Sequence, residues 1–463
     1  MSKSRLSLLL VGVLLLALAL AACSTATPTP TQEPTAEVQA ATDTPTEEAV
    51  VEATEEAVME ATEEVVMEAT EEAVMEATEE VVMEATEEVV EMMGPSVMIA
   101  PDEPLRVGFA AAMVGEGLAP LGIDILRGVE LALEDYNNVV VVDGVEFTVE
   151  LDVQDSLCSP EGGQAVANRF ASDPSIVGVI GPMCSSACDA SQPIFDAAGY
   201  SNISASCTAA NLTTNGNTSF NRTVPSDAAQ GVIAAEFIYN ELGVTKIAVL
   251  DDGSTYGAGL ADLLIQRFEE LGGEVVARDA VTVGDTDFRA LLEDIASKGP
   301  ELLYFGGFNS EAARLLEQRI DVGLEDIPFM GADGIYGPEL AELAGAAAEG
   351  VYASAPRAAS SDELDAFRAR YVETYGEEPP SAFNTNSYDA ANLLMMAVQA
   401  VGHVDDNGDL VVDRNELAAY IRSASFDGLT GSLACDGTGE CSTADVAFYQ
   451  ITDGAYVELG ADE

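Results

Sequence analysis

Short apolar runs alternate with amphipathic stretches from about residue 104 to residue 355. The runs have the length of strands, and the stretches carry apolar side chains at helical spacing. Strands are predicted at 105–110, 147–153, 176–180, 200–203, 246–250, 274–280, 302–306 and 328–331, with helices between them at 123–136, 162–171, 228–242, 256–271, 288–296 and 310–322. This alternation predicts parallel sheets covered by helices on both faces. Because it restarts near residue 226, it predicts two α/β lobes.

The rest of the folded chain adds elements to these lobes. A strand is predicted at 350–355, helices at 362–375, 382–401 and 414–423, and a last strand at 446–451. This segment is too short to build a third domain, so we expect it to pack on the two lobes.

Two polar turns follow neighbouring predicted strands, at 184–186 and 206–208. The carboxyl ends of parallel strands meet at one edge of a sheet, and ligands of open α/β sheets bind at that edge. The first turn also opens a helix, whose amino end attracts anions. The stretch from Gly178 to Thr208 therefore predicts a cradle for a small anion or an amino acid.

The amino-terminal 22 residues predict a signal peptide. Lys3 and Arg5 precede an apolar run at 6–20, and small residues follow at a cleavage site. The run is short for a membrane span. Cys23 directly follows Leu-Ala-Ala, a sequence that resembles the bacterial lipobox, so we expect cleavage before Cys23 and lipid attachment to it.

Residues 23–103 predict a low-complexity, lipid-anchored linker. Its first part is rich in Pro, Thr, Ala and Glu, and residues 52–91 repeat an acidic octad, EATEEAVM or EATEEVVM. In a helix with an eight-residue repeat, successive apolar pairs point in different directions and do not align in one seam. Like charges also stand four residues apart without compensation. These patterns favour a solvated spacer over a coiled-coil stalk.

Charge and cysteine content exclude several classes of function. Residues 1–103 hold 23 acidic and 2 basic side chains, and the remaining residues hold 58 acidic and 16 basic ones. A protein of this charge repels nucleic acid and anionic membrane surfaces. His403 is the only histidine, and neither paired C-x2-C motifs nor a P-loop or nucleophile-elbow signature is present. We expect neither metal nor cofactor, and no enzymatic activity. Without Cys23 six cysteines remain, an even number that suits disulfides in an oxidising compartment.

Motifs in a characteristic order resemble the periplasmic binding proteins of the leucine/isoleucine/valine type, which serve ABC importers. They are VGF (107–109), GPMCSSA (181–187), NISASCTAANLT (202–213), RTVPSDAAQG (222–231), DDGSTYGAGLAD (251–262), DTDFRALLEDI (285–295), YFGGFNSEAARLLEQ (304–318), FMGADGI (329–335) and SYDAANLL (387–394). The resemblance covers about residues 104–460. It implies two doubly wound lobes joined by three crossovers, with lobe 1 at 104–226 and 356–430 and lobe 2 at 227–355 and 431–463.

The resemblance also implies a binding site between the lobes. Ser185 and Thr208 would bind the carboxylate of an amino acid, and Asp333 would close on its ammonium from the second lobe, aided by the Ser206 carbonyl. The remaining positions implied are Leu121, Met183, Cys184, Cys207, Tyr256 and Phe308.

Each of these residues has a plainer alternative. Ser185 could cap its helix, Asp333 could be a loop carboxylate, and Tyr256 and Phe308 could be packing residues. The chain also departs from the family pattern at Leu121, where relatives often carry an aromatic residue, and at Cys207 and Phe308, where they often carry a small residue and a tyrosine. The side-chain pocket is therefore less defined than the amino-acid cradle.

Three disulfides are expected. Family precedent implies a bond between Cys158 and Cys184. Cys188 and Cys207 then remain near the two polar turns, and Cys435 and Cys441 bracket a short loop, although sequence alone does not fix connectivity.

Residues 405–416 resemble a calcium loop but carry Leu410 where the sharp turn needs glycine. A surface turn leading into a strand and a helix is the preferred interpretation.

The sequence thus predicts a monomeric, extracytoplasmic lipoprotein. It would bind a small amino acid, most consistent with a branched-chain one, and deliver it to the membrane subunits of an ABC permease. A chemosensory ligand sensor is the alternative class. Amides, urea, aromatic amino acids and small acids are alternative ligands.

Overall fold

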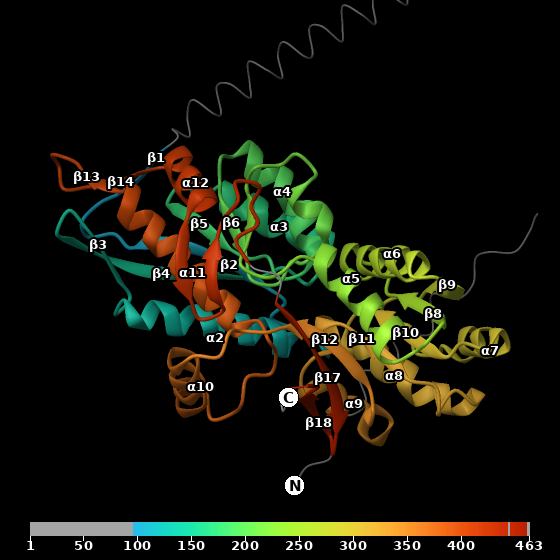
Figure 1. The fold of residues 1–463 in the computed structure, drawn as a ribbon. Coiled ribbons are helices and arrows are strands. Elements are labelled where there is room, and N and C mark those ends of the chain that lie inside the picture. The colour runs from blue at the N-terminus through green and yellow to red at the C-terminus, as the bar shows by residue number, and fades with distance from the viewer. Residues whose placement is uncertain (1–95, 443–444, 461–463) are drawn as a thin grey trace, which may run out of the picture. The chain divides into compact units, whose positions relative to one another are not determined.

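The computed structural model describes residues 96–442 and 445–460. The expected signal peptide, Cys23 and nearly all of the expected linker lie outside the described residues. Two lobes of parallel sheet and covering helices make up the described part, which confirms the predicted fold class (Figure 1).

Lobe 1 is built on a six-stranded sheet with the order β3-β4-β2-β5-β6-β7. All neighbours are parallel except β3, which forms a hairpin with β4. Helices α2 and α11 pack on one face and α3 and α4 on the other. The bounds are β2 (Leu105–Ala111), α2 (Ala119–Asp135), β3 (Val139–Val142), β4 (Val145–Asp155), α3 (Pro160–Ala171), β5 (Ile176–Ile180), α4 (Ser185–Ala197), β6 (Asn202–Ser204), β7 (Phe220–Arg222) and α11 (Asn384–Val401).

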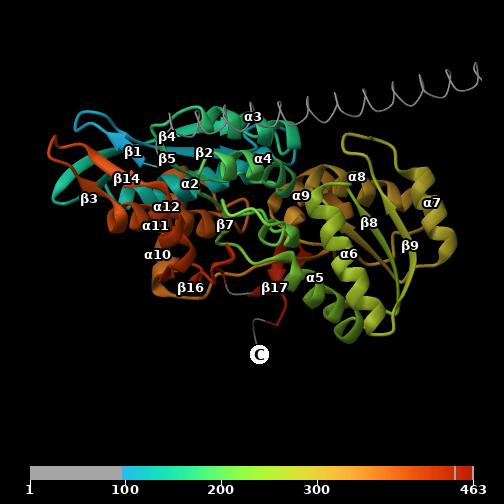
Figure 2. The same ribbon diagram turned by 90° about the horizontal axis from the view of Figure 1, so that it is seen from above.

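Lobe 2 is built on a seven-stranded sheet with the order β18-β17-β12-β11-β10-β8-β9. Helices α5 and α6 cover one face, and α7, α8 and α9 cover the other (Figure 2). The bounds are α5 (Asp227–Glu236), β8 (Lys246–Asp251), α6 (Thr255–Glu270), β9 (Glu274–Ala280), α7 (Arg289–Lys298), β10 (Leu302–Gly306), α8 (Asn309–Arg319), β11 (Phe329–Gly331), α9 (Pro338–Ala344), β12 (Tyr352–Pro356), β17 (Val446–Thr452) and β18 (Ala455–Glu458).

Smaller elements complete the described chain. The single-turn helices are η1 (Ala210–Thr213), η2 (Phe237–Glu241), η3 (Ile320–Val322), η4 (Asp333–Ile335) and η5 (Gly345–Ala348), and the remaining elements are β1 (Ser96–Ile99), α10 (Asp362–Tyr375), β13 (His403–Val404), β14 (Leu410–Asp413), α12 (Arg414–Ser423), β15 (Ser425–Gly428) and β16 (Gly431–Ala434). The chain passes between the lobes after β7, after β12 and after Cys441, the last two crossovers flanking α10 to β16.

The folded region begins earlier than the expected linker boundary at residue 103. Residues 96–99 form β1, which pairs antiparallel with β14 and buries Val97 and Ile99. A four-residue strand whose partner lies more than 300 positions away leaves too short an apolar pattern to be recognised from sequence.

The third crossover also lies later than the expected boundary at residue 431. β16 forms a hairpin with β15, and the following loop packs on β7 of lobe 1. There the Arg222 amide donates to the Gly439 carbonyl at 2.9 Å, and the Cys441 amide donates to the Arg222 carbonyl at 3.1 Å. Only β17 and β18 of this segment join lobe 2, because backbone pairing with β7 holds residues 439–441 on lobe 1.

Candidate functional site

The amino end of α4 forms one wall of the site. β5 ends at Ile180, and Gly181 turns the chain at φ +107°, where a Cβ atom would lie 2.2 Å from the Ala110 carbonyl oxygen, so only glycine fits. The helix then begins at Ser185, with Cys184 as its N-cap residue. The Ser185 hydroxyl accepts a hydrogen bond from the Ala209 amide at 3.2 Å and so ties the helix to the turn after β6. This bond differs from the helix cap that was the plainer alternative.

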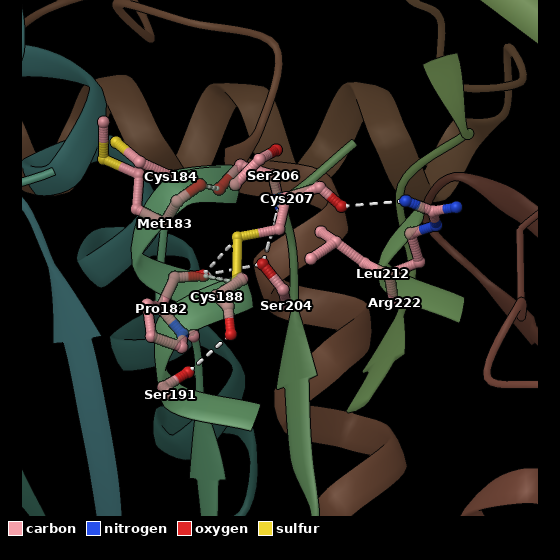
Figure 3. Close-up of a disulfide and its surroundings, with 12 residues drawn as sticks. Pro182, Met183, Cys184, Cys188, Ser191, Ser204, Ser206, Cys207, Leu212 and Arg222 are labelled. Atoms are coloured by element: carbon pink, nitrogen blue, oxygen red, sulfur yellow. Dashed lines mark hydrogen bonds between the residues drawn. A yellow bond between two sulfur atoms is a disulfide. The ribbon is translucent and has the colours of Figure 1, made fainter. Parts of the chain in front are cut away.

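The turn after β6 is held in place by side chains from β6, from β7 and from the turn itself (Figure 3). The Ser204 hydroxyl accepts from the Cys207 amide at 3.0 Å and donates to the Pro182 carbonyl at 2.7 Å. Arg222, which is fully buried, donates to the Cys207 and Ala209 carbonyls at 3.1 and 2.9 Å. The Ser206 hydroxyl donates to the Met183 carbonyl at 2.8 Å. Both polar turns are therefore fixed relative to each other.

Disulfides reinforce the same wall. The six cysteines of the described chain are joined as Cys158–Cys184, Cys188–Cys207 and Cys435–Cys441, the pairs expected from the sequence. The second bond links the first turn of α4 to the turn after β6, and both of its sulfurs lie against the Pro182 carbonyl oxygen (Figure 3). Glu440, inside the loop closed by the third bond, forms an ion pair with Arg222.

Lobe 2 contributes one buried carboxyl group. Asp333 follows β11 and is 3% exposed. Its Oδ1 atom accepts hydrogen bonds from the Tyr256 hydroxyl and from Gln230 Nε2, both at 2.9 Å. Tyr256 stands in the first turn of α6 and in turn accepts from the Gly334 amide at 3.1 Å. Because both donors bind Oδ1, they leave Oδ2 for another partner.

Burial sets the charge state of this carboxyl group. Removal from water raises the pKa of Asp333 to about 6, although the hydrogen bonds from Tyr256 and Gln230 act in the opposite direction. The same burial raises the pKa of the Tyr256 hydroxyl well above its usual value, so that it remains a donor. A cation brought to Asp333 would favour its ionised form, so the site is suited to a positively charged group.

Between the two walls lies a small cavity lined by residues of both lobes. Its polar groups come from Ser185 and Ser206 on lobe 1 and from Asp333 on lobe 2. The other lining residues are Leu121, Met183, Cys184, Tyr256, Phe308, Gly334 and Phe383. A largely apolar cavity with a few convergent polar groups is typical of a small-molecule site.

Eight of the ten binding positions implied by the sequence resemblance line this cavity. Cys207 and Thr208 do not. The Cys207 side chain points into lobe 1 toward Cys188, and Thr208 is fully buried behind the cavity with its carbonyl accepting from the Asp227 amide at 2.9 Å.

Sequence reasoning missed Phe383 and Gln230. Phe383 immediately precedes α11 and packs its buried ring against the cavity, whereas the expected helix began at residue 382 and hid this position. Gln230 lies on α5 within the RTVPSDAAQG motif, and its contact with Asp333 spans 103 positions. Nothing local in the sequence indicates that contact.

The lobes also touch around the cavity. The Thr255 amide of lobe 2 donates to the Ser186 hydroxyl of lobe 1 at 3.0 Å, and the Ser310 hydroxyl donates to the Glu116 carbonyl at 2.7 Å. Gly117 faces Ser310 so closely that a Cβ atom would lie 2.7 Å from its oxygen. The two lobes are thus closed over the cavity.

A larger hollow lies near the second crossover, bordered by Tyr336, Arg357, Arg368, Tyr449 and Tyr456 among others. Its arginines and tyrosines do not oppose a buried carboxyl group across an enclosed space. The smaller cavity is therefore the candidate site.

No metal site is evident among the described residues. At the expected surface turn, Asp405 accepts from the Asn407 and Asp409 amides, and Asp413 caps α12. The described part also contains no helix long and apolar enough to cross a bilayer.

Comparison with known proteins agrees with this geometry. Residues 104–455 match the family described as periplasmic binding protein. The leucine-, isoleucine-, valine-, threonine- and alanine-binding protein of Pseudomonas aeruginosa is 30% identical over 351 residues, which cover 75% of this chain and 89% of the relative. The Leu/Ile/Val/Thr-binding protein of Salmonella typhimurium is also 30% identical, over 73% of this chain and 88% of its own.

Solved structures of similar proteins share the fold. The leucine-binding protein LivK of Thermotoga maritima superposes with a TM-score of 0.70 at 27% identity, covering 77% of this chain and 98% of that one. The LivJ substrate-binding protein of Streptococcus pneumoniae, solved with isoleucine, gives 0.66 at 25% identity, covering 77% and 100%. An ABC transporter solute-binding protein of R. palustris, solved with benzoate, has a TM-score of 0.67 at 22% identity, covering 77% of this chain and 96% of that one, and shows the fold alone.

The fold and the interlobe cavity define a two-lobed solute-binding protein. The chain belongs to the periplasmic binding protein family, which is a family of extracytoplasmic binding proteins rather than of enzymes.

Proposed function

We propose that this protein is the solute-binding component of an ABC importer and that it binds a branched-chain amino acid between its lobes. The observation that carries the proposal is the placement of Asp333 across one small cavity from Ser185 and the amino end of α4. A cationic partner stabilises the ionised form of a buried carboxyl group, and a helix amino end favours an anion. An α-amino acid supplies both charges on adjacent atoms.

The apolar walls support an aliphatic side chain. Leu121, Met183, Phe308 and Phe383 offer no hydrogen-bonding group to the ligand's side chain. A hydroxyl or amide brought against them would lose its water without a replacement, which costs about 1–3 kcal/mol. The names of the relatives, several of which are Leu/Ile/Val-binding proteins, favour the same ligands.

Asp333 also argues against aromatic acids such as benzoate, which one structural neighbour binds. Benzoate has a carboxylate but no ammonium group, so it would leave a buried carboxyl group facing an uncharged ring. Tyr256, Phe308 and Phe383 could accommodate the ring itself. The charge of the ligand, rather than its shape, would therefore exclude it.

Calorimetric titration against a panel of solutes tests this assignment. Leucine, isoleucine and valine should bind one to one with dissociation constants of about 1 μM or tighter, and benzoate, urea and acetamide should not compete. Tight binding of benzoate or an amide, with no response to any α-amino acid, would identify a different ligand class.

Lipid attachment at Cys23 and signal cleavage after residue 22 form part of the same proposal. The lipobox-like sequence supports them, because the cysteine follows the apolar run directly. The linker of about 80 residues would then let a monomer reach the permease from its anchor, since such a coil spans about 50 Å. Mass spectrometry of the purified mature protein should find an acylated amino-terminal Cys23, and Cys23→Ala should release the protein from membranes.

Transport and chemosensing would use the same lobes. Ligand-dependent stimulation of the cognate permease's ATPase in liposomes would support transport, and its absence would favour a sensor.

A further inference from the structure

A second carboxyl group lies behind the cavity, at the first crossover between the lobes. Asp227 opens α5, and its amide donates to the Thr208 carbonyl at 2.9 Å. The side chain is fully buried, and neither carboxyl oxygen has a hydrogen-bond partner among the described residues. The Thr208 hydroxyl lies beside this carboxyl group and stabilises its charged form, although the pair does not reach good hydrogen-bond geometry.

Asp227 connects the two halves of the binding site. Through Thr208 it contacts the turn that carries Ser206, and three residues along the same helix Gln230 donates to Asp333. Gln230 Oε1 and the Tyr304 hydroxyl are further buried oxygens without a partner in the described chain. Several buried oxygens at this crossover, two of them in the Asp227 carboxyl group, thus have no hydrogen-bond partner in the described chain.

The charges around Asp227 do not balance an ionised carboxylate. It is faced by Asp333 from η4, by Tyr256 from α6, by Tyr304 from β10 and by Arg222 from β7. Arg222 is the one cation in this set, and it already pairs with Glu440. Burial raises the pKa of Asp227 well above its usual value, and the neighbouring Asp333 raises it further. Two such carboxyl groups titrate as a pair.

We propose that Asp227 is a second acid of the ammonium half of the site, which carries a proton in the free protein and releases it to solvent when an amino acid binds. This inference rests on the proposed function. The ligand brings a positive charge to the side of the carboxyl pair, while its carboxylate lies toward the positive end of α4. One O–H bond of Asp227 breaks, the proton passes to the buffer, and the carboxyl pair is left ionised around the ammonium.

Proton release makes affinity depend on pH in a defined direction. Where one proton leaves per ligand, the association constant rises tenfold per pH unit, up to the pH at which the free pair is already ionised. Above that pH the affinity becomes constant. Asp227 would therefore weaken binding in acid without touching the ligand directly.

Calorimetry of leucine binding in two buffers with different ionisation enthalpies, such as phosphate and Tris, counts the released protons. With the full folded chain, proton release on leucine binding should be measurable near pH 6 and should fall toward zero as the pH rises and the free carboxyl pair ionises. Asp227→Asn should reduce the number of released protons to near zero. Asp389→Asn is a matched control, because it removes a buried lobe 1 carboxyl group that lines no part of the cavity, and it should leave the number unchanged.

The outcomes separate this inference from the function on which it rests. Leucine binding with no buffer-dependent enthalpy between pH 6 and 8 would overturn the inference and leave the function intact. Undiminished proton release from Asp227→Asn would place the proton elsewhere and also overturn it. If no amino acid binds at all, the proposed function fails, and the inference fails with it.

Discussion

Asp333 is the residue that should recognise the positive charge of the ligand. It is buried, and its two donors hold Oδ1 so that the carboxyl group has one orientation. Asp333→Asn keeps the shape and removes the charge. We expect leucine affinity to fall by roughly 30-fold or more, because losing one member of a buried charge pair costs about 2–5 kcal/mol. Titration calorimetry measures the change, and Asp389→Asn should bind as the unmodified protein does. Equal affinity of Asp333→Asn would remove Asp333 from the ammonium site.

Phe383 is the residue that should decide how well a longer side chain is held. It is 3% exposed, and truncating it to alanine opens an apolar wall of the cavity. Phe383→Ala should weaken leucine binding by roughly 5- to 100-fold, the equivalent of about 1–3 kcal/mol of lost apolar contact. The shorter side chain of alanine does not reach Phe383, so the affinity for alanine should fall less than the affinity for leucine. Equal losses for the two ligands would show that Phe383 supports the lobe rather than the ligand's side chain.

At the scale of elements, the strongly patterned segments were predictable. The bounds expected for β9, β10, α10 and α12 coincide with those observed. Their apolar positions repeat with a clear period and are bounded by polar or glycine residues, so local sequence suffices. Short strands such as β1 and β14 depend on a distant partner, and no local pattern marks them.

The residues of the candidate site also divide into those that the sequence marks and those that depend on distant contacts. The residues at strand ends, such as Ser185 and Asp333, could be anticipated because the topology places strand ends together and family motifs mark them. Gln230 and Asp227 could not, because their roles arise from contacts across the first crossover. The environment of a buried carboxyl group is a property of the folded state.

The Cys188–Cys207 bond should stabilise the two elements that it joins. Its cysteines are 19 positions apart, and closing a loop of that length contributes about 3 kcal/mol in the chain-entropy account. Replacing both cysteines with alanine should lower the melting temperature by roughly 4 °C and weaken leucine binding, because the turn beside Ser206 loses a brace. Differential scanning calorimetry gives the first value.

A shorter disulfide loop provides the comparison. Cys435 and Cys441 are 6 positions apart, so removing that pair should cost about 2 kcal/mol and lower the melting temperature less. An equal or larger effect would mean that packing of the loop on Arg222, and not chain entropy, sets its contribution.

The whole molecule should become more stable as the pH falls from neutrality. Burial raises the pKa values of Asp124, Asp252 and Asp389 to about 6, above the 3.8 of an exposed aspartate. Between those pH values the folded state binds more protons than the unfolded state, so stability is gained on acidification and lost as the pH rises through 6. The excess of acidic side chains acts in the same direction, because protonation relieves their mutual repulsion.

Melting temperatures recorded from pH 7.5 to 5.5 test this balance. We expect an increase of several degrees toward pH 5.5 and a smaller increase in Asp389→Asn. Asp173 has the opposite effect on stability, because its hydrogen bonds with Ser175 and its ion pair with Arg106 lower its pKa. That effect is confined to pH values near or below 3.8. A melting temperature that falls between pH 7.5 and 5.5 would contradict this balance.

A crystal structure of the protein with leucine tests the central claim most directly. The account predicts one leucine in the interlobe cavity, with its carboxylate at Ser185 and the amino end of α4 and its ammonium within 3.2 Å of an Asp333 oxygen, a normal hydrogen-bond length. Leucine bound in the reverse orientation, or outside this cavity, would contradict it.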